Sequence, residues 1–295
     1  MADLPRAVPQ RSSRWAPLLR SLRHDRVVVI ALVVVGVAVL AAIAGPLITP
    51  YSPTAQDLSN RLTPPFAPRP GVSILGSDPL GRDMLSRIIA GARVSLAVAA
   101  AAVLVSGVIG VVLGVIAGMS TGWLGALIMR IADIQFSIPY LILALTLVAV
   151  VGPGLINIIV VLGVSGWVPY ARTARAQVLH VKQLDFIEAS RAIGSSDLRI
   201  AVRHILPHAL GVVGVIATIE SARVIITEAS LSFLGLGVPI GTPTWGVMIA
   251  DGRNYLGTAW WVSALPGLAI VITVVALNIV GDWLSDYANP VLRDR

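Results

Sequence analysis

Few residues in this 295-residue chain are able to do chemistry, and their spacing argues against an enzyme site. The chain has no cysteine, which excludes thiolate catalysis, disulfides and cysteine-based metal sites. His204 and His208 stand four positions apart, as two metal ligands on a helix do, but Ile205 occupies the place where zinc proteases need a glutamate. Pro207 distorts the spacing further. We therefore predict a structural or interfacial role for these histidines, with no metal site and no catalytic residue.

The single lysine bears on ATP hydrolysis. A phosphate-binding P-loop ends in Gly-Lys-Ser/Thr, because the lysine must reach the β and γ phosphates. Lys182 is the only lysine of the chain, and Val181 and Gln183 flank it. The chain therefore has no P-loop of its own.

Two ionisable residues lie inside an apolar run. Glu220 and Arg223 are three positions apart, which places them on one face of a helix. Charged groups are costly within a membrane, and they usually pair with one another or line a cavity. Two interpretations remain open: an ion pair, mutual or with a partner subunit, and the lining of a pathway for a charged solute.

Composition places these residues in a membrane protein. Apolar residues make up 56% of the chain, charged residues only 13%, and the mean hydropathy is +0.85. So little polar surface cannot coat a water-soluble globule of this length. The net charge of +7 comes from basic residues that flank apolar runs, so membrane topology explains it better than nucleic-acid binding does.

Six apolar runs are long enough to be counted as membrane spans, at about 20 residues per span. They cover residues 27–48, 94–117, 134–151, 155–168, 209–226 and 261–280. The first run could instead belong to a signal peptide, since arginines precede it and Ala42-Ile43-Ala44 resembles a cleavage site. Its length and the five runs that follow favour a retained anchor. The predicted fold class is all-α and transmembrane.

Lysine and arginine counts predict the orientation. With the N-terminus inside, the inner segments hold 15 such residues and the outer segments six, so both termini are expected in the cytoplasm. The resulting division has cytoplasmic ends (1–26 and 284–295) around a transmembrane domain (27–283), with outer loops at 49–93 and 227–260 and an inner loop at 172–207. Six prolines between residues 49 and 70 predict an extended, irregular connection in the first outer loop. In the second, residues 229–237 are apolar and glycine-rich, but prolines and glycines between 239 and 246 break any full span. The segment 227–259 is therefore predicted to be irregular backbone that lines an entrance, with Glu228 and Asp251 as either architectural or pathway residues.

The inner loop reads as a helical hairpin. Phe186, Ala189 and Ile193 recur at helical spacing and form one apolar face. Gly194 supplies a left-handed stop, Ser195 or Ser196 can cap a second helix near Asp197, and Pro207 can start the next one. A hairpin of this kind could lie on anionic lipid headgroups or contact another protein. Within the second span, Gly107, Gly110, Gly114 and Gly118 form a stripe that favours close helix packing.

Three segments together carry a family resemblance. In the inner loop, Glu188, Ala189, Gly194, Leu206 and Pro207 match the EAA loop of permease subunits of binding-protein-dependent ABC importers, and Ser190 stands where alanine is usual. Residues 75–87 resemble the segment before the second span in the dipeptide, oligopeptide and nickel branch. Residues 228–237, with Trp245-Gly246 and 250–252, resemble the outer loop of that branch. The chain is most similar to its second, C-type permease.

This resemblance implies a type I importer fold with six helices in a bacterial inner membrane. It also implies four kinds of partner: a second, related permease, two ATP-binding subunits that hold ATP and magnesium, an extracytoplasmic solute-binding protein, and the surrounding bilayer. The hairpin residues would then be coupling residues, and the solutes would be peptides or, alternatively, nickel chelates and related small solutes. A self-sufficient secondary transporter would show paired halves, and no internal repeat is evident. An intramembrane enzyme would need catalytic groups in its spans, and none of the four histidines lies in one.

Overall fold

The computed structural model describes residues 25–67, 70, 74–239 and 241–288. Within these residues the secondary structure is helical, apart from one isolated bridge between Ser77 and Asp83. Five helical runs are long and apolar enough to cross a membrane, and a bent helix pair brings the number to six. The predicted all-α transmembrane fold is therefore confirmed. Most of the predicted N-terminal segment, 1–26, lies outside the described residues.

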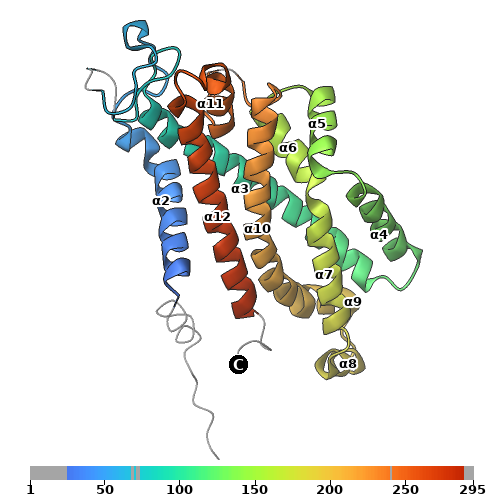
Figure 1. The fold of residues 1–295 in the computed structure, drawn as a ribbon. Helices are drawn as coiled ribbons and strands as arrows, with labels where there is room; N and C mark the ends of the chain where they lie inside the picture. The colour runs from blue at the N-terminus through green and yellow to red at the C-terminus, as the bar shows by residue number, and fades with distance from the viewer. Residues whose placement is uncertain (1–24, 68–69, 71–73, 240, 289–295) are drawn as a thin grey trace, which may run out of the picture.

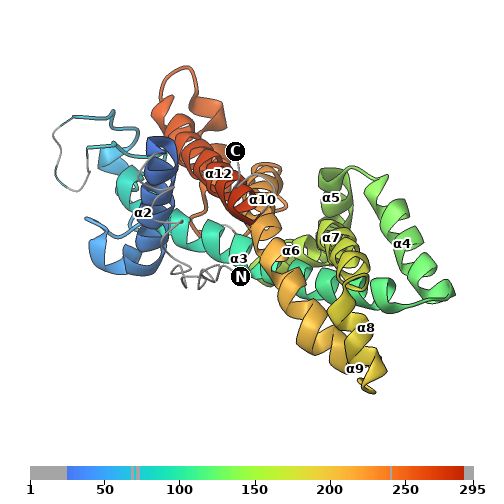
Figure 2. The same cartoon turned by 90° about the horizontal axis from the view of Figure 1, so that it is seen from below.

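Three helices stand side by side, and a fourth crosses them. In Figure 1, α2 (Arg26–Ile48), α12 (Trp261–Ala288) and α10 (Leu206–Phe233) form a layer, and α3 (Met84–Met119) passes obliquely across it. The view from below in Figure 2 shows the same crossing, and α3 contacts all three helices. Because α3 has 36 residues, it runs from the outer loop to the hairpin.

Glycines let α3 approach α7 (Trp167–Val181) closely, which confirms the predicted stripe. A Cβ atom added to Gly110 would lie 2.5 Å from the Trp167 carbonyl oxygen, and one added to Gly114 would lie 2.4 Å from that of Ala171. At Gly118 it would come within 2.6 Å of the Val178 side chain. Gly107 differs, because its nearest neighbour would be the Tyr170 ring at an ordinary 3.8 Å.

The predicted third span, 134–151, is wrong as one straight helix. The chain forms α4 (Trp123–Phe136) and α5 (Tyr140–Val151), which meet at an angle of 91°. Pro139 lies at the break, since proline has no backbone N–H to donate and keeps the residue before it out of the α-helical conformation. The predicted fourth span, 155–168, is too short: α6 (Leu155–Ser165) leads through Gly166 into α7, and together they form a 27-residue run.

Two outer boundaries also differ from the prediction. Helix α3 begins ten residues before the predicted 94, where Asp83 accepts a hydrogen bond from the Ser86 N–H and caps the helix. Helix α10 extends to Phe233, so residues 229–233 are helical and not irregular. Hydroxyl groups there bond within the helix, as Ser230 does to the Ile226 carbonyl, so the polar residues do not interrupt it. Gly235, with φ of +81°, follows its end, and α11 (Trp245–Gly252) comes after the irregular segment.

Candidate functional site

The predicted hairpin is present at one end of the bundle. Helix α8 (Asp185–Ala192) is followed by Gly194 with φ of +86°, and then by the short helix α9 (Asp197–Ile200), which Ser196 caps through the Arg199 N–H. Pro207 lies in the first turn of α10, as predicted, where its missing N–H breaks no required hydrogen bond. The chain does not break before it, because a π-helical turn, Ala201–Ile205, joins α9 directly to α10.

The hairpin has a buried side and an exposed apolar side. Val178, Val181, Ile187, Ile200 and Ile205 form a buried cluster that holds it together. The predicted face of Phe186, Ala189 and Ile193 points away from the protein: Phe186 is 42% exposed and Ile193 84% exposed. An exposed apolar surface at the tip of a polar segment is typical of a protein contact.

The remaining predicted coupling residues lie on the same element. Glu188 is exposed. Ser190, which stands where the family usually has alanine, donates its hydroxyl hydrogen to the Phe186 carbonyl at 2.7 Å, so this extra polar group has a partner within the helix. Leu206 is half-buried against a cluster that includes Tyr170, whereas Pro207 is exposed. His204 packs edge-on against the Phe186 ring, with 5.8 Å between ring centroids, in agreement with a structural role.

Sequence reasoning missed how the hairpin connects to the bundle. The Lys182 ammonium group donates to the Gly118 carbonyl at 3.2 Å, at the last turn of α3. A cation is favoured there by the helix dipole and by free carbonyl groups. The position of the only lysine directly before the hairpin is the one signal that could have indicated this contact.

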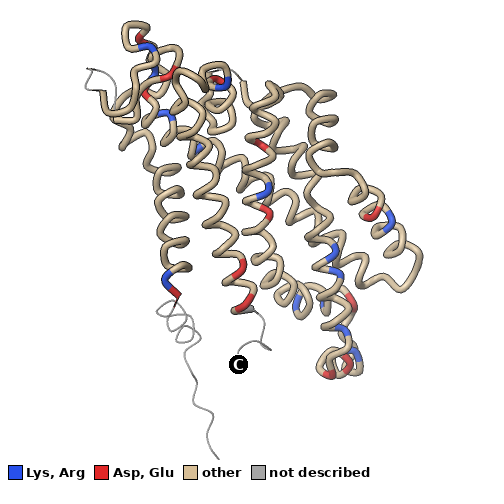
Figure 3. Tube along the Cα trace, in the orientation of Figure 1, with Lys and Arg blue, Asp and Glu red and all other residues tan. Residues whose placement is uncertain are grey.

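The two ionisable residues of α10 form the predicted ion pair. Arg223 contacts the Glu220 carboxylate, and its guanidinium group also stacks on the Tyr140 ring of α5, 4.1 Å from the ring centre. In Figure 3, most charged residues gather towards the two ends of the bundle, which leaves few in the middle of the spans. The pair is thus neutralised, and Arg223 lines a cavity at the bend between α4 and α5.

Glu228 lies in the interior, where α3, α10 and α11 meet. Its side chain is almost completely buried and accepts hydrogen bonds from Ser232 at 2.7 Å and from Ser95 at 3.4 Å. The Ser95 hydroxyl in turn accepts from the Trp245 N–H. These contacts favour the architectural interpretation of Glu228.

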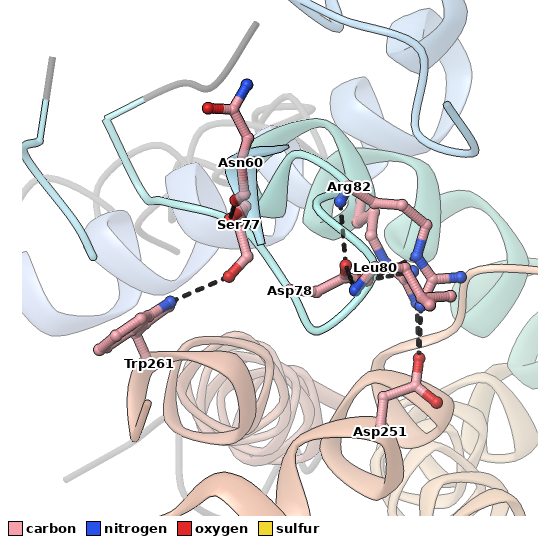
Figure 4. A network of polar contacts seen from close by, with 8 residues as sticks. Asn60, Ser77, Asp78, Leu80, Arg82, Asp251 and Trp261 are labelled. Carbon is pink, nitrogen blue, oxygen red and sulfur yellow. Dashed lines mark hydrogen bonds and ion pairs between the residues drawn. The ribbon is translucent and has the colours of Figure 1, made fainter. Parts of the chain in front are cut away.

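Two carboxylates and two arginines tie the outer loop to α11 (Figure 4). Asp78 contacts Arg82 and Arg87, the latter at 2.7 Å, and Asp251 binds the same two guanidinium groups at 2.9 and 3.0 Å. We call these four residues the ion ring. Its two carboxylates balance its two guanidinium groups, so it carries no net charge. Burial raises the pKa of the Asp251 carboxyl, the Arg82 guanidinium opposes this shift, and the Asp78 carboxylate adds to it. Asp251 also borders a cavity of about 430 Å³, so it stays a candidate pathway residue.

We expect Arg87→Met to destabilise the protein by about 3–5 kcal/mol, because it leaves two acidic groups with one buried partner. The side chain of Arg87 is only 3% exposed. Arg172→Met is the control, since Arg172 pairs with Asp133 at the surface with 42% of its side chain exposed, and such pairs contribute less than about 1 kcal/mol. Thermal unfolding of both purified variants measures the difference, and equal midpoints would contradict a structural role for the ion ring.

Comparisons with known proteins agree with this geometry. Residues 110–294 match the family model "Binding-protein-dependent transport system inner membrane component", and residues 13–65 match "N-terminal TM domain of oligopeptide transport permease C". The chain is 40% identical to the di/tripeptide transport system permease protein DppC of Pseudomonas aeruginosa, over 93% of this chain and 91% of that protein. It is 37% identical to the dipeptide transport system permease protein DppC of Bacillus subtilis, over 93% and 85% of the two chains.

A solved structure shows the same fold. An inward-facing structure of the MetNI methionine ABC transporter aligns with a TM-score of 0.54 and 23% identity, over 70% of this chain and 98% of that one. The family match over more than half of the chain and the 40% identical relative confirm the resemblance that the three sequence segments indicated. The chain therefore belongs to the inner-membrane components of binding-protein-dependent transport systems, the permease subunits of bacterial ABC importers.

Proposed function

We propose that this permease forms half of the transmembrane pathway of an importer for di- or oligopeptides. The relatives carry names of di/tripeptide, dipeptide and D,D-dipeptide transport systems, and they match nearly the whole chain. A second, related permease completes the pathway, and an extracytoplasmic binding protein delivers the peptide. Two ATP-binding subunits hold ATP and magnesium and carry out hydrolysis.

The hairpin is the proposed contact with the ATP-binding subunits. The observation that carries this role is the exposure of Phe186, Ile193 and Leu198 on an element whose other side is fixed to the bundle. An exposed apolar patch on a rigid support can transmit a push, because Lys182 and the buried cluster connect it to α3. Glu188, Ala189, Ser190 and Gly194 lie on this element, and Leu206 and Pro207 follow it.

The orientation belongs to the same proposal. The hairpin lies on the cytoplasmic side, together with the N-terminal segment 1–26 and the tail that was predicted to begin at 284. The described part of that tail is the end of α12, which reaches Ala288. The loops that hold the ion ring then face the binding protein. The excess of lysine and arginine on the hairpin side supports this placement.

Uptake by the reconstituted transporter tests the function. The permease, its partner permease, the ATP-binding subunits and the binding protein are placed in liposomes, and uptake of labelled Ala-Leu is followed with ATP enclosed. We expect uptake that requires ATP and every subunit. Uptake by the permease alone, or a complete transporter that moves nickel but no peptide, would overturn the proposal.

A further inference from the structure

A cavity of about 220 Å³ lies at the bend between α4 and α5, against residues of α6, α7 and α10. Its walls are largely apolar, with two aromatic rings and one cationic group, Arg223 of α10. The apolar and aromatic wall residues include Phe136, Ile138, Pro139, Tyr140, Leu143 and Val168. Sites for whole drug-sized ligands usually measure about 300–1,000 Å³, so this space suits one end of a small solute.

Hydrogen bonds across the bend fix the walls of this cavity. The Gln135 amide donates to the Ser165 carbonyl at 2.7 Å and accepts from the Trp167 indole N–H at 2.7 Å. On the other arm of the bend, the Tyr140 hydroxyl donates to the Leu162 carbonyl at 3.1 Å. Both arms are therefore attached to the α6–α7 run, and the cavity is formed in advance of any ligand.

Two donors at the cavity have no partner among the described residues. Arg223 gives one terminal nitrogen to Glu220 and stacks on Tyr140, which leaves its buried Nε–H without a hydrogen bond. The Ser165 hydroxyl is likewise buried and unpaired, and Ser165 is only 4% exposed. Buried polar groups in proteins are nearly always paired, so two such donors around one cavity favour a ligand or solvent that carries hydrogen-bond acceptors.

We propose that this cavity binds the carboxylate terminus of a peptide in transit. This inference rests on the proposed peptide uptake and assigns a binding group within the pathway. Arg223 and Ser165 would donate to the two carboxylate oxygens, and the apolar walls would contact the adjoining side chain.

The position of Arg223 argues against other ligands. Arg223 lies well inside the helical run Asp197–Phe233, at a depth that the headgroups of lipids do not reach. Glu220 already balances the charge of Arg223, so the two unpaired donors decide between ligands. A cation or an apolar solute accepts no hydrogen bond and would leave both donors unpaired in a low-dielectric setting. A carboxylate has two acceptor oxygens and can pair with both donors at once.

Saturation-transfer NMR on the assembled transporter in nanodiscs tests the proposal. The probes are Ala-Leu and its C-terminal amide, titrated without the binding protein so that only the membrane subunits are measured. We expect the amide to bind about tenfold more weakly than the free acid, since it loses a charge-assisted hydrogen bond. Arg223→Met should weaken acid binding by about tenfold and remove the preference for the acid over the amide.

Further variants separate binding from folding. Ser165→Ala should weaken acid binding by about threefold to fivefold. Ser221→Ala is the control, because its hydroxyl bonds to the Ala217 carbonyl at 2.7 Å within α10, and we expect no change. Arg223→Lys retains the charge and should restore part of the preference for the acid, which a variant defective only in packing would not do.

Three outcomes would overturn the inference: no saturation transfer from Ala-Leu, equal affinities for acid and amide in the parent, or unchanged acid binding in Arg223→Met. ATP-dependent uptake of Ala-Leu is measured on the same preparations. Uptake without a preference for the acid would sink only the carboxylate site, whereas a complete transporter that takes up no peptide would sink the proposed function.

Discussion

Gly194→Leu is expected to reduce ATP-dependent uptake to less than about a tenth of the parent rate, with normal amounts of permease in the membrane. At φ of +86° a residue with a Cβ atom is strained by about 1–2 kcal/mol, which shifts the turn between α8 and α9. Among the described residues, no atom lies within 4 Å of a Cβ added there, so the permease itself can hold the side chain. The loss would arise where the ATP-binding subunit meets the hairpin.

Gly152→Leu provides the matched control. Gly152 has φ of +94° and open space around its added Cβ, but it lies between α5 and α6 at the other end of the bundle. With ψ of 162°, Gly152 lies in a backbone region that essentially only glycine adopts, so leucine is strongly strained there too, yet uptake should fall much less. Parallel measurements of membrane level, uptake and ATPase rate distinguish the two variants. Equal losses of uptake would mean that strain alone, and not the location on the hairpin, limits transport.

Gly114→Ala is expected to destabilise the permease by about 3 kcal/mol, although alanine is normally the better helix former by about 1 kcal/mol. The added Cβ would lie 2.4 Å from the Ala171 carbonyl oxygen and 2.8 Å from the Ala174 Cβ, so α3 and α7 must separate. Backbone atoms cannot move aside as a flexible side chain can. Thermal unfolding followed by size-exclusion chromatography measures the loss.

Gly107→Ala shows whether this effect comes from the close contact between α3 and α7 or from replacing any glycine of α3 by alanine. Its added Cβ would meet the Tyr170 ring at 3.8 Å, an ordinary contact, so the variant should equal or slightly exceed the parent in stability. The two substitutions are chemically identical and seven residues apart on one helix. If both changed the unfolding temperature by the same amount, the close approach of α3 and α7 would not be the cause.

Composition predicted the transmembrane class and approximately the number of spans, but the places where helices begin, bend or continue were harder to predict. A hydropathy window treats Pro139 as one residue in an apolar run, whereas its missing N–H divides that run into α4 and α5. In the opposite direction, Ser230 and Ser232 reduce the apolarity of the segment after 226. Their hydroxyl groups bond within α10 or to Glu228, so the helix continues to Phe233.

The hairpin was predictable because its signals are local: a glycine stop, a serine cap and a helical apolar face. The function of that apolar face was not predictable, since periodicity cannot distinguish a face that packs against the protein itself from one that is exposed and available to another subunit. Ile187 is the buried residue of α8, whereas Phe186 and Ile193 are exposed. The ion ring and the contact of Lys182 with Gly118 join residues 169 and 64 positions apart, and a single sequence contains no signal for such pairs.

Cross-linking from the tip of the hairpin is the most direct test of coupling through this element. The chain has no native cysteine, so Ile193→Cys carries a single thiol at an 84% exposed position. We expect a maleimide–benzophenone reagent, bound through its maleimide to this thiol, to insert into a C–H bond of the ATP-binding subunit on illumination of membranes, and the joined complex to lose ATP-dependent peptide uptake. Labelling of the same cysteine by an impermeant maleimide from the outer face of the membrane, with no cross-link to the ATP-binding subunit, would contradict it.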